Sequence, residues 1–449
     1  MKRYFLIIVL TFLTLGMTAQ NADILTLDSC FALARANNAQ FKTNQLEIEK
    51  AKEVKKQIYT KYFPQVSANY LAYYAAKPLI QYGVDDIHDN FGEVLKAIIE
   101  FLNNNVGLNV PEEIDLMHYG HSVSVLAVQP VYAGGRVRVG NKLAKLGVEA
   151  AELQAEVSER DLLESIESTY YLVIGLQSKV ETLESALNLI DSLDRVADAA
   201  LKAGLVTKND QLRVALERNK YKALQLQLNN GIKLASQLLC QEIGIEYPAE
   251  GLNLDDDLHH TGVLMENVGF ERPEQRLLQL QIDAEIFYKR MSRGEALPQL
   301  GVGASAWYGN MITDYKLNAL LFARLEVPLT KWWETSHKIK EHNLKIEQYK
   351  LMQQDLTEKM SLQEEQAFNQ MVEAQALLKS DEAALDMAQE NYRVAELNYR
   401  AGVTTITDVL EANALLLQAQ NAITDRQITY VSAQRRYHDL TGKGLNTNN

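Results

Sequence analysis

The chain has 449 residues, and its 45 Lys and Arg against 58 Asp and Glu give a formal net charge of −13 at pH 7. This acidic balance argues against a nucleic-acid partner, which needs clustered Lys and Arg. Two cysteines, Cys30 and Cys240, are too few for a disulfide scaffold or a cysteine-based zinc site. The chain contains only 8 Pro and 23 Gly, a depletion that favours long uninterrupted helices.

The first residues predict an export signal at 1–19. Lys2 and Arg3 precede the apolar run 5–15, and Ala19 is a small residue at a suitable cleavage point. The run is shorter than the roughly 20 residues that a membrane-spanning helix needs, and no later stretch reaches 18 apolar residues. We therefore expect an exported protein rather than an inner-membrane helical protein.

The chain contains an internal repeat. AGLVTKND at 203–210 aligns with AGVTTITD at 401–408, and Pro130 aligns with Pro328 at the same offset of 198 residues. The first half has 36 more residues between Pro64 and Pro130 than the second half has between Pro298 and Pro328. A repeat of this length predicts a duplicated domain rather than a short-period solenoid. The predicted division is a first repeat at 20–244, a linker at 245–272, a second repeat at 273–442 and a tail at 443–449.

Four segments alternate with period two, at about 64–73, 121–130, 298–308 and 318–328. Leu300, Val302 and Ala304, for example, alternate with small or polar residues. Strands of about ten residues with this alternation, with Tyr and Trp near their ends, are typical of an outer-membrane barrel. Each strand alone fits a small soluble meander equally well. The insertion at about 75–120 is expected to be extracellular. It holds an apolar helical stripe at 91–107, which either covers the barrel mouth or packs on its neighbours across a three-fold axis.

A long helical pattern follows each pair of strands, so each half is predicted to run strand, strand, long helix, tight turn, long helix. The hairpins are predicted at 136–244, with its turn at 203–210, and at 334–442, with its turn at 401–408. Their 3–4 apolar rhythm is that of a coiled-coil seam. Gly204 and Gly402 stand where a helix end favours a left-handed residue. From Arg136 to Ala203 the helix would be roughly 100 Å long.

Four strands do not close a barrel, because single-chain barrels begin at about eight. Open edges in lipid would leave backbone groups unpaired, so we expect the chain to share its barrel with copies of itself. The predicted fold is mainly α with a membrane β-barrel. In a trimer, four strands per chain would complete a 12-stranded barrel, which continues as a long antiparallel α-helical coiled-coil tunnel.

The sequence resembles the TolC-like outer-membrane efflux protein family. The resemblance rests on five segments: LTLDSCFALARANN (25–38), FPQ (63–65), QPVYAGGR (129–136), AGLVTKND (203–210) and NYRAGVTTITDVLEA (398–412). It implies a homotrimer in outer-membrane lipid with a helical tunnel in the periplasm. It further implies docking to a periplasmic adaptor and an inner-membrane transporter, and a passive duct that is not an enzyme and has no cofactor. HExxH, P-loop, GxSxG and Rossmann motifs are absent from the sequence.

Asp408 and Glu411 share one helical face just after the second turn. The resemblance maps both onto an acidic ring that narrows the periplasmic entrance. Such a ring would hold six carboxylates, which attract cations and raise one another's pKa. The alternative is an ordinary acidic first helical turn, which the helix dipole favours.

The matching positions of the first half are Asp210 and Arg213. The resemblance suggests that Tyr399 bonds toward Asp210 on a neighbouring helix and holds the entrance closed. Arg213 would then pair with Glu411 as an extra latch, or else be a solvated surface arginine. Arg324 and Glu326 alternate with apolar residues, which indicates either a barrel lumen or a surface ion pair at a strand end.

Two other functions stay open at this point. The exit duct of a protein-secretion system would have the same architecture. A structural coiled-coil envelope protein would lack hairpin turns and acidic residues at the turns, whereas this sequence has both.

Overall fold

The computed structural model of the chain describes residues 24–77, 80–83, 90–106, 113–116, 119–202, 204, 206–255, 272–310 and 315–441. The predicted signal peptide, most of the linker and the tail lie outside the described residues. Within the described part of the chain, no helix combines the length and the hydrophobicity needed to cross a membrane.

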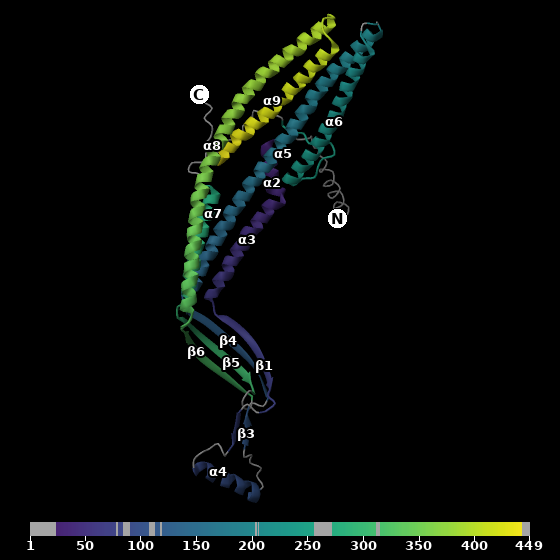
Figure 1. The fold of residues 1–449 in the computed structure, drawn as a ribbon. Coiled ribbons are helices and arrows are strands. Elements are labelled where there is room, and N and C mark those ends of the chain that lie inside the picture. Colours follow the sequence, from purple (N-terminus) through teal and green to yellow (C-terminus); the bar gives the residue numbers. More distant parts are fainter. Residues whose placement is uncertain are drawn as a thin grey trace, which may run out of the picture. The chain divides into compact units, whose positions relative to one another are not determined.

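Long helices and one sheet account for most of the described chain (Figure 1). The first half contains α2 (Leu27–Asn37), α3 (Ala39–Tyr59), β1 (Gln65–Tyr74), β2 (Ile80–Gly83), α4 (Asn90–Phe101), β3 (Glu113–Leu116), β4 (Tyr119–Ala133), α5 (Arg136–Lys202) and α6 (Lys208–Ile243). The second half contains α7 (Pro273–Glu295), β5 (Gln299–Gly309), β6 (Lys316–Glu326), α8 (Lys331–Arg400) and α9 (Ile406–Thr441).

The chain divides into two compact units that each combine segments of both halves. We call 50–149 with 280–350 the sheet unit, and 1–49 with 150–279 and 351–449 the helical unit. The division into sequential repeats stays a prediction about how the sequence arose. Each unit draws on both halves, so neither half is compact by itself.

The sheet unit holds a four-stranded antiparallel sheet in the order β1-β4-β5-β6. Each half of the chain contributes one adjacent pair of strands, and β4 joins β5 across the middle. The order leaves β1 and β6 at the two edges. The smaller β2–β3 ribbon and α4 lie in the predicted insertion.

The strand register gives this sheet two different faces. One row across the sheet contains Val66, Ala127, Ala304 and Leu321, and a second row on the same face contains Tyr70, Val123, Tyr308 and Leu317. The opposite face has a row with Asn69, Ser124, Trp307 and Asn318. Leu126, Leu320 and Phe322 interrupt this second face, which is therefore mixed. A sheet with one apolar face and one face that carries polar residues is the pattern of a barrel wall between lipid and water.

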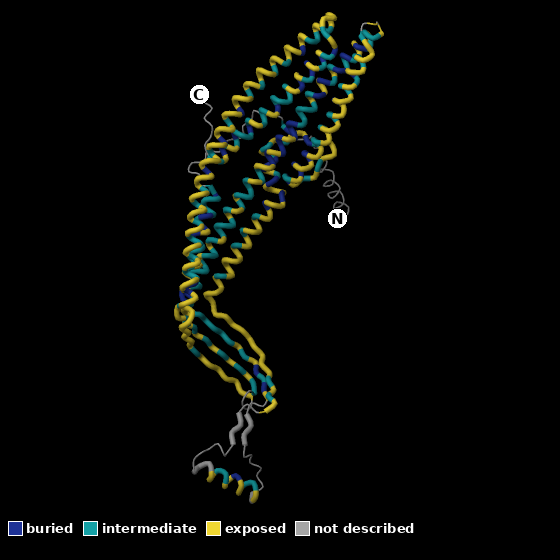
Figure 2. The backbone as a smooth tube through the Cα atoms, viewed as in Figure 1, coloured by how far each residue is buried: buried dark blue, intermediate teal, exposed yellow. Residues whose placement is uncertain are grey.

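Buried residues concentrate in the helical unit (Figure 2). One apolar cluster joins α2 to α5 and α6 and includes Phe31, Val173 and Leu239. A second cluster takes residues from all four helices of the two hairpins: Leu183, Ile190, Val214, Tyr392, Val409 and Leu416. The two hairpins therefore pack around one core.

Helices α3 and α7, each directly before a pair of strands, were not predicted. The expectation that each half begins with its strands was incomplete. Helix α3 has one buried residue, Phe41, among 21, so its sequence shows little of the apolar periodicity by which helices are found.

The backbone at the end of β4 approaches α7 closely. Gly134 has φ +62°, and a Cβ there would lie 2.1 Å from the carbonyl oxygen of Gly294. A Cβ on Gly294 would lie 2.6 Å from the carbonyl oxygen of Gly134. Both distances are far inside van der Waals contact with backbone atoms, so only glycine fits at either position.

We expect Gly294→Ala to destabilise the sheet unit strongly, by about 3 kcal/mol or more, because rigid backbone must move. Gly147→Ala is the matched control, since a Cβ at this position inside α5 meets no atom within 4 Å and alanine favours a helix by up to about 1 kcal/mol. Thermal unfolding of the detergent-purified variants measures both changes. Equal melting temperatures for the two variants would contradict the close approach.

Candidate functional site

Both hairpins turn at a glycine in the left-handed region. Gly204 has φ +72° and Gly402 has φ +75°, and no atom lies within 4 Å of a Cβ built at either one. Backbone conformation, rather than space, is thus the reason for glycine. The amide of Gly402 donates to the carbonyl of Tyr399 at 3.0 Å, and that of Val403 donates to the carbonyl of Asn398 at 2.8 Å. These bonds satisfy carbonyl groups at the end of α8.

Each returning helix begins with a capping box. In α6 the Thr207 hydroxyl accepts from the Asp210 amide at 3.3 Å, and Asp210 Oδ2 accepts from the Thr207 amide at 3.0 Å. In α9 Thr405 and Asp408 make the same pair of bonds, at 3.4 and 2.9 Å. The two predicted turn acids therefore have one structural role in common.

Asp408 is exposed and is held in its ionised form. Hydrogen bonds from the Thr404 hydroxyl, and then from the Thr405 hydroxyl and amide, lower the pKa of Asp408 to about 2. The predicted rise in pKa through crowding would have to come from other chains of a trimer. Asp210 has a lowered pKa for the same reason, through its bonds to Thr207.

Glu411 lies one turn further along α9 and is exposed. Glu411 takes no part in the capping box. The two predicted ring acids therefore differ, because Asp408 fixes the turn and Glu411 does not. This difference was not visible in their i, i+3 spacing.

The other predicted latch residues lie where the two hairpins meet. Arg213 Nη1 donates to Thr407 Oγ1 at 2.7 Å, so within one chain it bonds a hydroxyl of the second hairpin rather than Glu411. Burial raises the pKa of the half-buried Tyr399, and the charge of Asp210 adds to the rise. The charge of Asp210 on the first hairpin therefore acts on the phenol of Tyr399 on the second.

Arg324 and Glu326 lie on the polar face of the sheet, because Arg324 pairs in register with Gly301 and Glu326 pairs with Gln299. Arg324 Nη2 lies 2.8 Å from Glu326 Oε2, and both side chains are exposed. They therefore form an ion pair on the face that a barrel would turn toward water.

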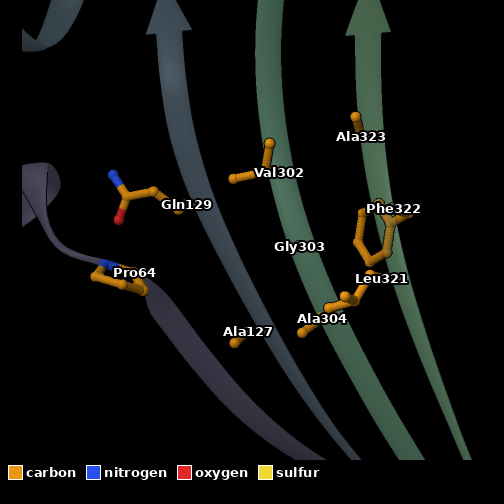
Figure 3. Close-up of a pocket in the computed structure, with 9 residues that line it drawn as sticks. All are labelled: Pro64, Ala127, Gln129, Val302, Gly303, Ala304, Leu321, Phe322 and Ala323. Atoms are coloured by element: carbon orange, nitrogen blue, oxygen red, sulfur yellow. The ribbon is translucent and has the colours of Figure 1, made fainter.

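The sheet also carries a shallow depression of about 550 Å³ (Figure 3). It is lined mainly by small or apolar residues, including Ala127, Val302, Ala304 and Leu321, and Gln129 is the one polar side chain among them. Such a lining offers no set of polar groups that would orient a substrate. We regard it as part of the contour of the apolar face.

Residues 272–443 match the family of outer membrane efflux proteins. It is a family of outer-membrane channel proteins, not of enzymes. No curated protein sequence matches the chain.

The whole described chain has the fold of solved outer-membrane channels. It is 13% identical to the Campylobacter jejuni channel CmeC, with a TM-score of 0.72 over 94% of this chain and 87% of that one. It is 15% identical to VceC of Vibrio cholerae, with a TM-score of 0.70 over 93% of this chain and 96% of that one. It is 14% identical to MtrE of Neisseria gonorrhoeae in its open state, with a TM-score of 0.71 over 93% of this chain and 89% of that one. The predicted fold class, four strands with two long helical hairpins, is confirmed.

Three side chains of the sheet unit have the order of a hydrolase triad. Ser292 Oγ lies 3.2 Å from His342 Nε2, and His342 Nδ1 lies 2.7 Å from Glu285 Oε2. Ser292 is buried, however, and stands inside α7, where the neighbouring amides are used by the helix rather than free to stabilise an oxyanion. The three residues join α7 to α8.

The capping of Asp408 predicts an acid-sensitive turn. Because its folded pKa lies below the ordinary value of 3.8, the carboxylate stabilises the turn fully above pH 3.8, and this contribution is lost as the pH falls through about 2. Hydrogen exchange of residues 400–412, corrected for intrinsic rates, measures the change. Protection is expected to be constant from pH 7 to 4 and to fall below that.

Asp408→Ala is expected to lower the protection of this turn at all pH values and to abolish its pH dependence. Thr441→Ala, at the far end of α9, serves as the control variant. If Asp408→Ala behaved like this control, Asp408 would have no capping role.

Proposed function

We propose that the chain forms a homotrimer that acts as the outer-membrane exit duct of a tripartite efflux system. In this role it conducts small molecules passively from a periplasmic adaptor and an inner-membrane pump to the exterior. The observation that carries the proposal is the four-stranded sheet with two unlike faces and an edge strand at each side. The match of residues 272–443 to outer membrane efflux proteins favours efflux over protein secretion.

The edges of the sheet require further strands. In lipid each unpaired backbone group costs several kcal/mol, and β1 and β6 would each present a row of such groups. Pairing β6 of one chain with β1 of the next removes both edges and forms a 12-stranded barrel in three chains. The face with Arg324 and Glu326 then lines the lumen, and the face with Ala304 and Leu321 meets lipid.

Exposed apolar side chains near the hairpin tips support partners for the helical unit. Leu212 and Leu216 on α6 are 56% and 69% exposed, and Val403 at the second turn is 75% exposed. Side chains of this size gathered at one end of a helical body indicate a protein interface. Neighbouring chains of the trimer and a periplasmic adaptor are the partners we propose for it.

The entrance of the duct would lie at the hairpin tips. Three copies of Asp408 and Glu411 would form an acidic ring, in which Asp408 keeps the turn rigid and Glu411 supplies the charge that solutes meet. The latch would consist of Asp210 with Tyr399, and of Arg213, which the bond to Thr407 holds at the junction of the hairpins.

The mass of the detergent-extracted protein tests the shared barrel. Light scattering with correction for bound detergent should give three times the mass of the mature chain. A monomeric mass would leave the edges of β1 and β6 unpaired in lipid, and the proposal of a conduit would then fail.

Channel recordings test the acidic ring. Glu411→Gln should reduce the preference for K⁺ over Cl⁻ by roughly twofold or more, because three charges are lost where the duct is narrow. Reversal potentials in a KCl gradient measure the preference, and Glu181→Gln, an exposed acid on α5, is the control. An unchanged preference would mean that Glu411 lies outside the conducting path.

The same recordings examine the latch. Arg213→Ala should raise the conductance of the closed state, since it removes the bond between the hairpins. Thr407→Val removes the same bond from the other side and should have the same effect. Closed-state conductance equal to that of the unmodified protein in both variants would exclude a latch at Arg213.

A further inference from the structure

A second cluster of titratable side chains lies in the helical unit where α2, α5 and α9 meet. It surrounds a partly open pocket of about 350 Å³, which residues of all three helices and Pro273 line. This volume is at the lower end of the range found for small-molecule sites, about 300–1,000 Å³. The pocket has no part in the proposed duct, its entrance or its barrel.

Two buried polar atoms of this pocket have no hydrogen-bond partner in the part of the chain that the structure describes. Glu167 and His438 are each 8% exposed. Glu167 Oε2 lies 3.0 Å from Arg435 Nε, but Glu167 Oε1 and His438 Nε2 are buried without a hydrogen bond to any described residue. Because leaving a buried polar atom unpaired is unfavourable, two such atoms in one pocket indicate a missing hydrogen-bond partner.

The charge of the pocket favours a cation. Its lining holds five carboxylates, those of Glu156, Glu159, Glu164, Glu167 and Asp439, but only three arginines.

All three arginines are already engaged. Arg35 pairs with Glu159 at 2.8 Å and Arg160 with Glu274 at 2.6 Å. Arg435 pairs with Glu167 and also stacks over the Phe31 ring at 5.0 Å. None is left free to bind an anion, whereas the excess of carboxylates would attract a positive charge.

The ionisation of Glu167 shows the same imbalance. Burial raises the pKa of Glu167 to about 7 despite the opposing charge of Arg435, and Asp439 and Glu164 add to the rise. One guanidinium is therefore too little to keep this carboxylate ionised as it would be in water. A second cation in the pocket would favour the ionised form.

The unpartnered atoms define the kind of cation. In the tautomer of His438 that carries its proton on Nδ1, which lies 3.7 Å from Asp439 Oδ1, Nε2 is an acceptor. Both free atoms are then acceptors, which suits a ligand with N–H groups. The described residues contain no group of three or more His, Cys, Asp or Glu placed to hold a metal ion.

We propose that this pocket binds a small organic ammonium ion, an aliphatic amine that donates N–H groups to Glu167 Oε1 and His438 Nε2. Its positive charge compensates the excess of carboxylates, and its hydrogen bonds satisfy both buried acceptors. The site is independent of the proposed duct, since it lies within one chain and involves no residue of the entrance.

Isothermal titration of the full detergent-purified protein with 1,4-diaminobutane tests the site. Saturable binding is expected at pH 8, and at least threefold weaker binding at pH 6, because Glu167 becomes protonated while the amine stays charged. Tetramethylammonium, which has the charge but no N–H group, should bind at least tenfold more weakly than the diamine. Absence of saturable diamine binding at pH 8, or equal binding of the two cations, would overturn the proposal.

Glu167→Gln keeps the size of the side chain and removes its charge, so diamine affinity should fall at least tenfold. Glu181→Gln, on the exposed surface of the same helix, should bind as the unmodified protein does. The pH dependence of the unmodified protein provides the readout if Glu167→Gln does not fold. Unchanged affinity in Glu167→Gln, or equal affinity at pH 6 and pH 8, would show that Glu167 does not hold the ligand.

Discussion

The unsatisfied backbone of the two edge strands is the constraint on which the proposed assembly depends. Strands β1 and β6 lie at the edges of a sheet that is apolar on one face and polar on the other. Lipid solvates the apolar face but cannot form hydrogen bonds with the backbone groups of the edge strands. Water can form those hydrogen bonds, but exposing a broad apolar face to water is unfavourable. Sharing the sheet among copies resolves both conflicts. Four strands per chain would give the twelve strands of the proposed barrel in three copies.

The helical unit meets its own constraint by packing two hairpins around one core. Leu183 of α5, Val214 of α6 and Val409 of α9 share one apolar cluster, which fixes both tips relative to each other. Each tip is closed by a left-handed glycine and a capping box. Charged groups at the tips can therefore differ between the hairpins without loss of the turn.

The sequence predicted what depends on local pattern. Period-two alternation indicated the strands, and the shared octapeptides indicated two turns at Gly204 and Gly402. Helix α3 was not predicted because it buries only Phe41 and so shows little apolar periodicity. Helix α7 was not predicted because no sequence signal separated it from the rest of the second half. The Glu167–Arg435 pair joins residues 268 positions apart, so no sequence window contains both. Buried charge is a property of packing, and only the structure reveals it.

The two hairpin turns share the bonds that cap a helix but differ in the charges next to the cap. Thr207 and Asp210 have the same bonds as Thr405 and Asp408, because every helix that returns from a tight turn must cap its first amides. Three residues further on the halves differ, with Arg213 in one and Glu411 in the other. Neither side chain takes part in the cap, so the turn tolerates either charge. Because the cap does not require a particular charge at these two positions, Arg213 and Glu411 can give each hairpin a different role in the proposed duct.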